Sequence, residues 1–164
     1  MQKKYYNTIG MIVRKARLKD IESLLVLYKQ LMAMHWDYDV LYRIQPRAVS
    51  DYRKFIKICM KDPQSLILVA EKKGEIAGFI TARILDRFSV FKIKKAAYIY
   101  DIFIKKTYRG KKVGKNLIDK FRLWAKRKKI KYIKLEVSPK NKKGLKFWES
   151  LGFYVFQHKM ALKI

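Results

Sequence analysis

The chain has 164 residues, of which 50% are hydrophobic and 14% aromatic. This apolar content excludes disorder as the main state, and the length suits one domain. The single cysteine, Cys59, excludes a disulfide framework, and with only two histidines we expect no metal site. No apolar stretch approaches the length of a membrane span, and the N-terminus lacks the apolar segment of a signal peptide. We therefore expect a cytoplasmic protein with no membrane partner.

The charge balance is strongly basic. Forty Lys and Arg residues face thirteen Asp and Glu residues, which gives a formal net charge of +27. A solvated surface of a thermophilic or lysine-biased protein is one interpretation, although thermophile surfaces usually enrich Lys and Glu together. The other interpretation is a polyanionic ligand or partner. Both remain open on composition alone.

Two kinds of apolar spacing alternate in the first half of the chain. Alternation over 11–17 predicts a strand, and helical spacing over 19–34 predicts a helix. Two apolar runs on either side of Lys73-Gly74 predict a hairpin. In chain order we expect a strand at 11–17, a helix at 19–34, an aromatic loop at 35–46, a helix at 47–60 and a hairpin at 65–85.

In the second half of the chain, the spacing of apolar residues changes between strand and helix periods, and the order of the elements predicts a parallel pair of strands. We expect a strand at 96–106, a basic helix at 111–129, a strand at 131–138, a helix at 141–152 ended by Gly152, and a strand at 153–164. The early strands can form an antiparallel meander. The strand–helix–strand unit implies a parallel pair with a right-handed crossover.

A basic glycine loop joins the strand at 96–106 to the helix that follows it. The loop runs Tyr108-Arg-Gly-Lys-Lys-Val-Gly-Lys115, at a junction where the backbone N–H groups of a helix start are free and its dipole is positive. This pattern favours a phosphate or pyrophosphate site. The alternative is an ordinary strand–helix turn on a basic surface. The loop matches neither a Walker loop nor a dinucleotide-binding glycine motif.

Two separated blocks resemble the GNAT superfamily of acyl-CoA-dependent N-acetyltransferases. The first, residues 109–114, is similar to the family signature Arg/Gln-x-x-Gly-x-Gly/Ala, and the second runs from Asn141 through Trp148 to Phe153. The resemblance implies an α/β (α+β) fold in a single domain over 1–164, with its signature core at 96–153. It also implies a mixed central sheet of six to seven strands with splayed parallel strands, flanked by about four helices.

The resemblance also implies how acetyl-CoA would be held. Backbone groups of Ile102, Phe103 and Ile104 would pair with the pantetheine arm, and Asn141 would contact the arm near its thioester end. The pyrophosphate would lie on the N–H groups of Arg109, Gly110, Lys111, Lys112, Val113, Gly114 and Lys115.

Lys112 departs from the signature, which usually has glycine at this position. A left-handed backbone there would cost a lysine about 1–2 kcal/mol. If the position already belongs to the first turn of the helix, lysine costs little and can add a phosphate contact. We favour the second interpretation.

Attack on a thioester requires a neutral amine, so a base is expected beside the splayed strands. Glu136 and Asp101 are the two carboxylates in the flanking strands. Each could instead be a structural partner of a cation. The stretch around Glu136 resembles ribosomal-protein N-terminal acetyltransferases, in which a glutamate at this place serves as the base, so we rank Glu136 slightly above Asp101.

The departing thiolate also needs a proton. The family's usual tyrosine falls at Trp148, whose indole is no workable acid at neutral pH. Tyr154 and Tyr100 are nearby in sequence, and a thiolate can also take its proton from water. Trp148 could alternatively mark a weakened or lost activity.

The net positive charge of the protein favours acceptor amines on molecules that a cationic protein does not repel. We expect an amine of a protein or peptide, with RNA or ribosome association through the helix at 111–129. Residues 109–143 alone carry fifteen Lys and Arg residues against two acids, more than one cofactor needs. The competing hypothesis is a GNAT-like nucleic-acid-binding module with weak or no catalysis. A monomer and a homodimer both remain open.

Overall fold

The computed structural model describes residues 10–164. Residues 1–9, which belong to the predicted domain and to the segment searched for a signal peptide, lie outside the described part. The sheet consists of β1 (Ile12–Lys15), β2 (Ser65–Lys72), β3 (Glu75–Asp86), β4 (Lys95–Ile104) and β5 (Ile133–Leu135). The helices are α1 (Ile21–Trp36), α2 (Ala48–Lys61), α3 (Val113–Arg127) and α4 (Lys142–Ser150).

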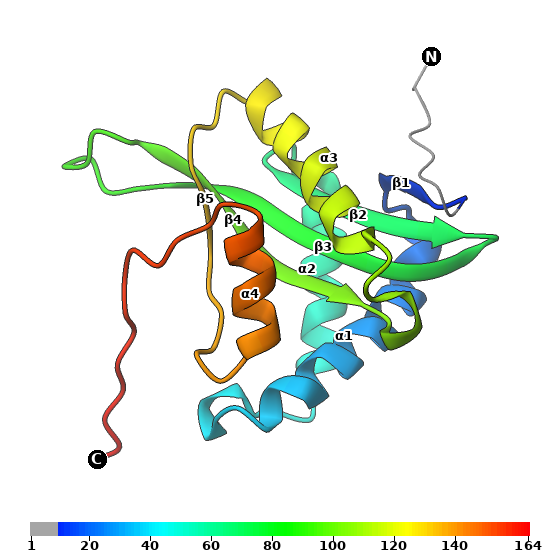
Figure 1. The fold of residues 1–164 in the computed structure, drawn as a ribbon, viewed down its shortest axis with the longest axis horizontal. Coiled ribbons are helices and arrows are strands. Elements are labelled where there is room, and N and C mark those ends of the chain that lie inside the picture. The colour runs from blue at the N-terminus through cyan, green and yellow to red at the C-terminus, as the bar shows by residue number, and fades with distance from the viewer. Residues whose placement is uncertain (1–9) are drawn as a thin grey trace.

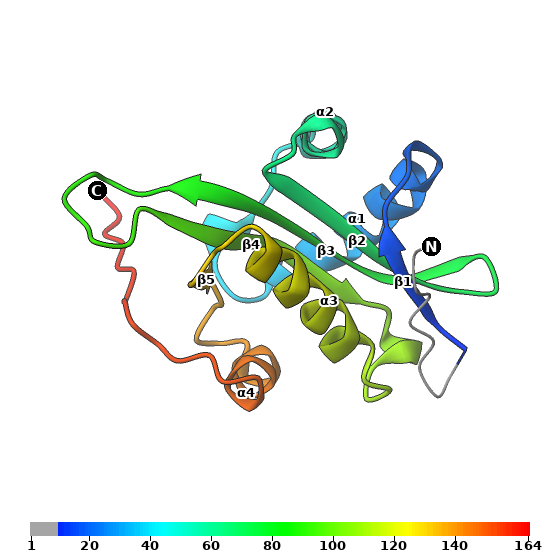
Figure 2. The same ribbon diagram turned by 90° about the horizontal axis from the view of Figure 1, so that it is seen from above.

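The sheet is mixed and follows chain order, β1-β2-β3-β4-β5. The first four strands pair antiparallel, which confirms the predicted meander, and β4 pairs with β5 in parallel after the α3 crossover. Helices α1 and α2 cover one face of the sheet, and α3 and α4 cover the other (Figures 1 and 2). The four helices match the number that the resemblance implied.

Two apolar cores follow from this layering. One lies between the sheet and α3 and includes Phe121, Leu117 and Trp148, and the other lies between the sheet and the α1–α2 pair and includes Phe79 and Ile56. Strands β2 and β3 contribute to both cores because successive side chains point to opposite faces. Their near-continuous apolar runs are explained by this double burial.

The prediction of six to seven strands is wrong, since the described residues form five. Residues 153–164 form no strand, and β5 is shorter than the predicted 131–138. A strand requires a partner for its backbone groups, and apolar composition does not supply one. The C-terminal segment extends away from the sheet (Figure 1), and large apolar side chains along it, such as Met160 and Leu162, are exposed.

A three-residue ionic cluster fixes the start of α1 against the sheet. Arg14 of β1 donates to Asp20 at 2.6 Å and pairs with Glu71 of β2 at 2.5 Å. Asp20 is almost fully buried, and its carboxylate also accepts the backbone N–H of Arg17 at 2.6 Å. Burial alone would raise the pKa of Asp20, but the bonds from Arg14 and Arg17 lower it below its usual value.

We expect Asp20→Asn to lower the free energy of unfolding at neutral pH by about 2 kcal/mol, because a charge-assisted bond to a partly buried arginine is lost. Since the pKa of Asp20 is lowered in the folded state, its contribution is present above the ordinary carboxyl pKa and is lost as the pH falls through the lowered value. Urea unfolding at a series of pH values measures both effects.

The matched control is Asp86→Asn, which removes an exposed carboxylate that pairs with Lys95 at 3.5 Å. We expect it to change stability by less than about 0.5 kcal/mol. Equal losses in the two variants would contradict the structural role given to Asp20.

Candidate active site

The site begins where β5 parts from β4. The last parallel pair is Ile99 with Leu135, whereas β4 continues to Ile104. In the described part of the chain, no strand pairs with this edge of β4 beyond Ile99. The exposed backbone edge therefore includes Ile102 and Ile104, although the carbonyl of Ile104 already accepts a bond from Arg109 Nε at 3.0 Å. The backbone groups of Phe103, expected on this edge, face β3 instead, because the Lys105 N–H bonds Ala77 O and alternate residues point to the same edge. The predicted splay of the parallel strands is present.

A β-bulge at the same place turns the side chains of β4. Thr81 of β3 faces Asp101 and Ala82 faces Ile99, so that Tyr100 is the extra residue. A bulge reverses the alternation of faces. Ile99 accordingly packs in the α3-side core, while Phe103 packs in the α1–α2 core. Asp101 is thereby directed toward α2.

The loop before α3 presents a row of backbone donors. The first recorded acceptor of the helix is Lys112 O, which receives the N–H of Asn116 at 3.0 Å. The N–H groups from Lys111 to Lys115 have no acceptor among residues 10–164. Gly110 has a φ of 73°, which gives the loop a turn that other residues rarely adopt. Free donors at a positive helix end form an anion site.

Lys112 does not belong to the first turn of α3, so the favoured interpretation of this position is wrong. It is the residue before the helix, with a φ of 59° in the left-handed region. The usual glycine of the signature would adopt this conformation without strain, whereas lysine pays about 1–2 kcal/mol.

Helix α4 closes over the start of α3. A Cβ at Gly114 would lie 3.1 Å from the Phe147 ring, so a side chain at this position would force the ring to shift. The side chain of Asn141 caps α4 by accepting the N–H of Gly144 at 2.9 Å. Its amide nitrogen has no acceptor in the part of the chain that the structure describes, and it can still donate to a ligand.

Asp101 is a partly buried carboxylate held by two hydroxyl groups. Thr81 Oγ1 donates to it at 2.7 Å and Tyr52 Oη at 2.8 Å. No cation pairs with it in the described residues, contrary to the structural alternative weighed for it. Burial raises its pKa above the usual value, and the two hydroxyl bonds offset part of that rise.

Glu136 follows β5 directly and has a different environment. Its carboxylate accepts a bond from Tyr98 Oη at 2.6 Å and pairs with Lys159 of the C-terminal segment. Desolvation raises the pKa of Glu136, but Lys159 and Tyr98 outweigh that effect and lower it below its usual value. Its side chain is 51% exposed. Neither Tyr98 nor Lys159 was recognised from the sequence, because their contacts with Glu136 are long-range.

The fold also places the three candidate proton donors in different environments. Trp148 is buried in the core, in ring contact with Phe147 and Phe153 at about 5 Å, which gives it a packing role. Tyr154 is 74% exposed and has no hydrogen bond to any described residue. Tyr100 lies at the separation of β4 and β5, and burial raises its pKa.

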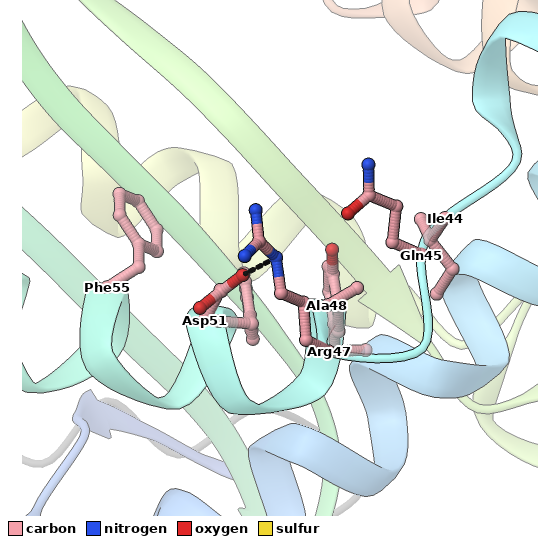
Figure 3. A pocket seen from close by; sticks show the side chains of 8 residues that line it. Ile44, Gln45, Arg47, Ala48, Asp51 and Phe55 are labelled. Atoms are coloured by element: carbon pink, nitrogen blue, oxygen red, sulfur yellow. Dashed lines mark ion pairs between the residues drawn. The ribbon is translucent and has the colours of Figure 1, made fainter.

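A cavity of about 400 Å³ opens on the α1–α2 side of the sheet. The residues that line it come from α1, from the segment before α2 and from α2 itself: Tyr28, Ile44, Gln45, Arg47, Ala48, Asp51, Tyr52 and Phe55 (Figure 3). Tyr52 connects the cavity to Asp101, and the Phe55 ring contacts Tyr100 at 5.5 Å. The cavity therefore borders both candidate groups of β4.

The cavity has an aromatic wall and a balanced charge. The Tyr28 and Tyr52 rings stack with centroids 3.6 Å apart. The carboxylate of Asp51 pairs with Arg47 at 3.5 Å (Figure 3). It also pairs with Lys54 at 3.6 Å. The aromatic residues of the loop predicted at 35–46 do not line the cavity. His35 contacts Tyr38 and Tyr42 instead, and burial lowers its pKa.

The residues present fit a nucleotide thioester such as acetyl-CoA. The free N–H groups before α3 suit a pyrophosphate, and the unpaired edge of β4 suits an extended arm with amide groups. The unpaired edge directly follows Asp101 in β4, and Glu136 directly follows Leu135, the last paired residue of β5. Within residues 10–164, no helix is long and apolar enough to cross a membrane.

Comparison with known proteins agrees with this geometry. Residues 28–153 match the acetyltransferase (GNAT) family model. An uncharacterized N-acetyltransferase of Archaeoglobus fulgidus is 28% identical over 140 residues, which cover 85% of this chain and 90% of the relative.

Solved structures share the fold at low sequence identity. A predicted acetyltransferase of Clostridium acetobutylicum, solved with acetyl-CoA, is 21% identical with a TM-score of 0.76, covering 93% of this chain and 96% of that one. The aminoglycoside acetyltransferase AAC(6')-Iy, solved with a CoA bisubstrate analogue, is 20% identical with a TM-score of 0.75, covering 94% and 97%. These relatives are uncharacterized and aminoglycoside acetyltransferases, so the expected likeness to ribosomal-protein acetyltransferases was not found.

We expect Lys112→Gly to raise the free energy of unfolding by about 1 kcal/mol, because glycine relieves the left-handed strain. Chemical denaturation measures the change. Lys111→Gly removes the same charge at the neighbouring position, whose φ is not positive, and should not stabilise the fold. A lower free energy of unfolding in Lys112→Gly would contradict the claim that the backbone of Lys112 is strained.

Proposed function

This chain belongs to the GNAT family of acetyltransferases, and on that premise we propose that it transfers the acetyl group of acetyl-CoA to a primary amine of a protein or peptide. The observation that carries the proposal is the separation of β4 from β5 after Ile99 and Leu135, beside the free N–H groups at the start of α3. When bound, acetyl-CoA supplies an activated acyl group as a thioester.

Three parts of the chain would hold that donor. The N–H groups from Lys111 to Lys115 would bind the pyrophosphate, and the side chains of the same loop would add charge. The free edge of β4 at Ile102 and the N–H of Ile104 would pair with the pantetheine arm. The amide nitrogen of Asn141 would donate to the arm, while its oxygen continues to cap α4.

We assign the base to Asp101 in preference to Glu136, which reverses the sequence-based ranking. A base acts best when its pKa lies near the working pH, and burial raises the pKa of Asp101 while Lys159 and Tyr98 lower that of Glu136. Asp101 also reaches the cavity through the hydroxyl of Tyr52. Glu136 would then serve to position Tyr98.

The proton balance follows from this assignment. The ammonium of the acceptor first loses one proton to Asp101, through Tyr52 where the amine lies in the cavity. The new C–N bond then forms as the C–S bond breaks, and the nitrogen loses a second proton, which replaces the one that the leaving sulfur takes up. The sulfur that leaves requires one proton. We assign its donor to Tyr100, because Tyr100 lies at the separation of the strands, whereas Tyr154 contacts neither carboxylate.

The acceptor is constrained by charge. Aminoglycosides carry several ammonium groups, and a protein of net charge +27 repels them at long range. The one carboxylate that lines the cavity, Asp51, is already balanced by Arg47 and Lys54. An amine on an acidic peptide or protein is the better match to these surroundings.

We expect Asp101→Asn to lower kcat by about 10²–10⁴, because the proton acceptor is lost. Glu136→Gln should lower it much less, and both variants should bind acetyl-CoA as tightly as the native chain. Release of the CoA thiol, followed with an acidic peptide as acceptor, measures turnover. In the native enzyme kcat/KM should rise with pH as Asp101 loses its proton. In Asp101→Asn this rise in the pH profile of kcat/KM should be absent.

Two outcomes would contradict these assignments. A larger loss in Glu136→Gln than in Asp101→Asn would make Glu136 the base. Faster turnover of an aminoglycoside than of the acidic peptide would overturn the acceptor class while leaving the acetyl transfer itself intact.

A further inference from the structure

A second hollow lies at the opposite end of α3 from the cofactor loop. Its volume is about 520 Å³, and it is formed by the end of β1, the end of α2, the start of β2 and the last turn of α3. Helix α3 has 15 residues, so its two ends are about 22 Å apart. Figure 1 shows α3 crossing the face of the sheet between them. This hollow, which we term the basic groove, is separate from the candidate active site.

Unpaired cations surround the basic groove. Lys15, Lys61, Arg127 and Lys128 line it, and none has an acidic partner among the described residues. Among the described residues, the only acid in the lining is Asp62. Its carboxylate already pairs with Arg83 at 3.0 Å and accepts a hydrogen bond from Ser65 Oγ at 2.7 Å. The groove therefore has an excess of positive charge that the protein itself does not neutralise.

The positive surface continues beyond the groove and includes aromatic rings. Lys126, Lys129 and Lys131 are exposed around the end of α3. Trp124 contributes its partly buried indole to the groove wall, and Tyr132 is 49% exposed on the segment that follows. Cations that follow a phosphate backbone, combined with aromatic faces on which bases stack, are the features of a single-strand binding surface.

We propose that the basic groove and the end of α3 bind a single-stranded segment of nucleic acid. Arg127, Lys128, Lys61 and Lys15 contact consecutive phosphates, and Trp124 stacks on a base. An acidic peptide would use the cations but would gain less from the indole face. A duplex is disfavoured, because the aromatic residue lines a hollow in the surface and bases paired inside a helix cannot reach it.

The test uses the full chain and a fluorescein-labelled single-stranded RNA of about 12 nucleotides, a length within the usual site size of such surfaces. Fluorescence anisotropy should report binding that weakens steeply between about 50 and 200 mM salt. Arg127→Gln/Lys128→Gln should lower the slope of log affinity against log salt by about 2. Trp124→Leu should weaken binding about tenfold with little change of that slope.

The control Lys92→Gln/Lys163→Gln removes the same charge from the β3–β4 loop and the C-terminal segment. It should leave the RNA affinity and the slope of log affinity against log salt nearly unchanged. Binding of acetyl-CoA by each variant shows that the variant is folded. Saturating acetyl-CoA should not displace the RNA, because the two sites lie at opposite ends of α3.

Four results would overturn the proposal. These are no RNA binding at about 50 mM salt, equal losses in the groove and control variants, displacement of the RNA by acetyl-CoA, and equally tight binding of polyglutamate. The third would place the RNA on the cofactor loop, and the fourth would indicate a general polyanion surface.

Discussion

The candidate site depends on one interruption in the sheet, the end of the parallel pairing between β4 and β5 at Ile99 and Leu135. Had the pairing continued, the backbone edge of β4 would be occupied and no extended ligand could lie against it. The bulge at Tyr100 adds a second consequence, because it directs Asp101 toward α2. Strand separation and bulge together bring a free edge, a carboxylate and a cavity to one place.

The two carboxylates at this place show how environment separates like groups. Among residues 10–164, Asp101 meets hydroxyl donors and no cation, so burial dominates and its pKa rises. Glu136 has Lys159 and Tyr98, so its pKa falls. In a chain with so few acids, most carboxylates pair with cations, and the one that meets only hydroxyl groups is suited to proton transfer.

Local signals in the sequence predicted most of the elements and their order. Apolar spacing placed α1, α2 and α3 within two residues of their observed bounds, and the Lys73-Gly74 turn identified the β2–β3 hairpin. The glycine signature predicted the loop before α3. These features depend on neighbouring residues alone, so one chain is enough to predict them.

Features that depend on distant partners were missed. The segment at 153–164 has strand-like composition but no strand pairs with it, and the left-handed backbone of Lys112 depends on how the loop enters α3. The partners of the two carboxylates, Tyr52 for Asp101 and Lys159 for Glu136, come from elsewhere in the chain. Ranking the carboxylates therefore required the folded structure.

The central claim is that the open edge of β4 and the start of α3 form one acetyl-CoA site. Amide chemical-shift mapping of the isotope-labelled protein during an acetyl-CoA titration tests it most directly. The account predicts that the largest shifts fall on Lys111–Lys115 and on Ile102–Ile104. Shifts concentrated at the basic groove, or no saturable shifts at all, would contradict it.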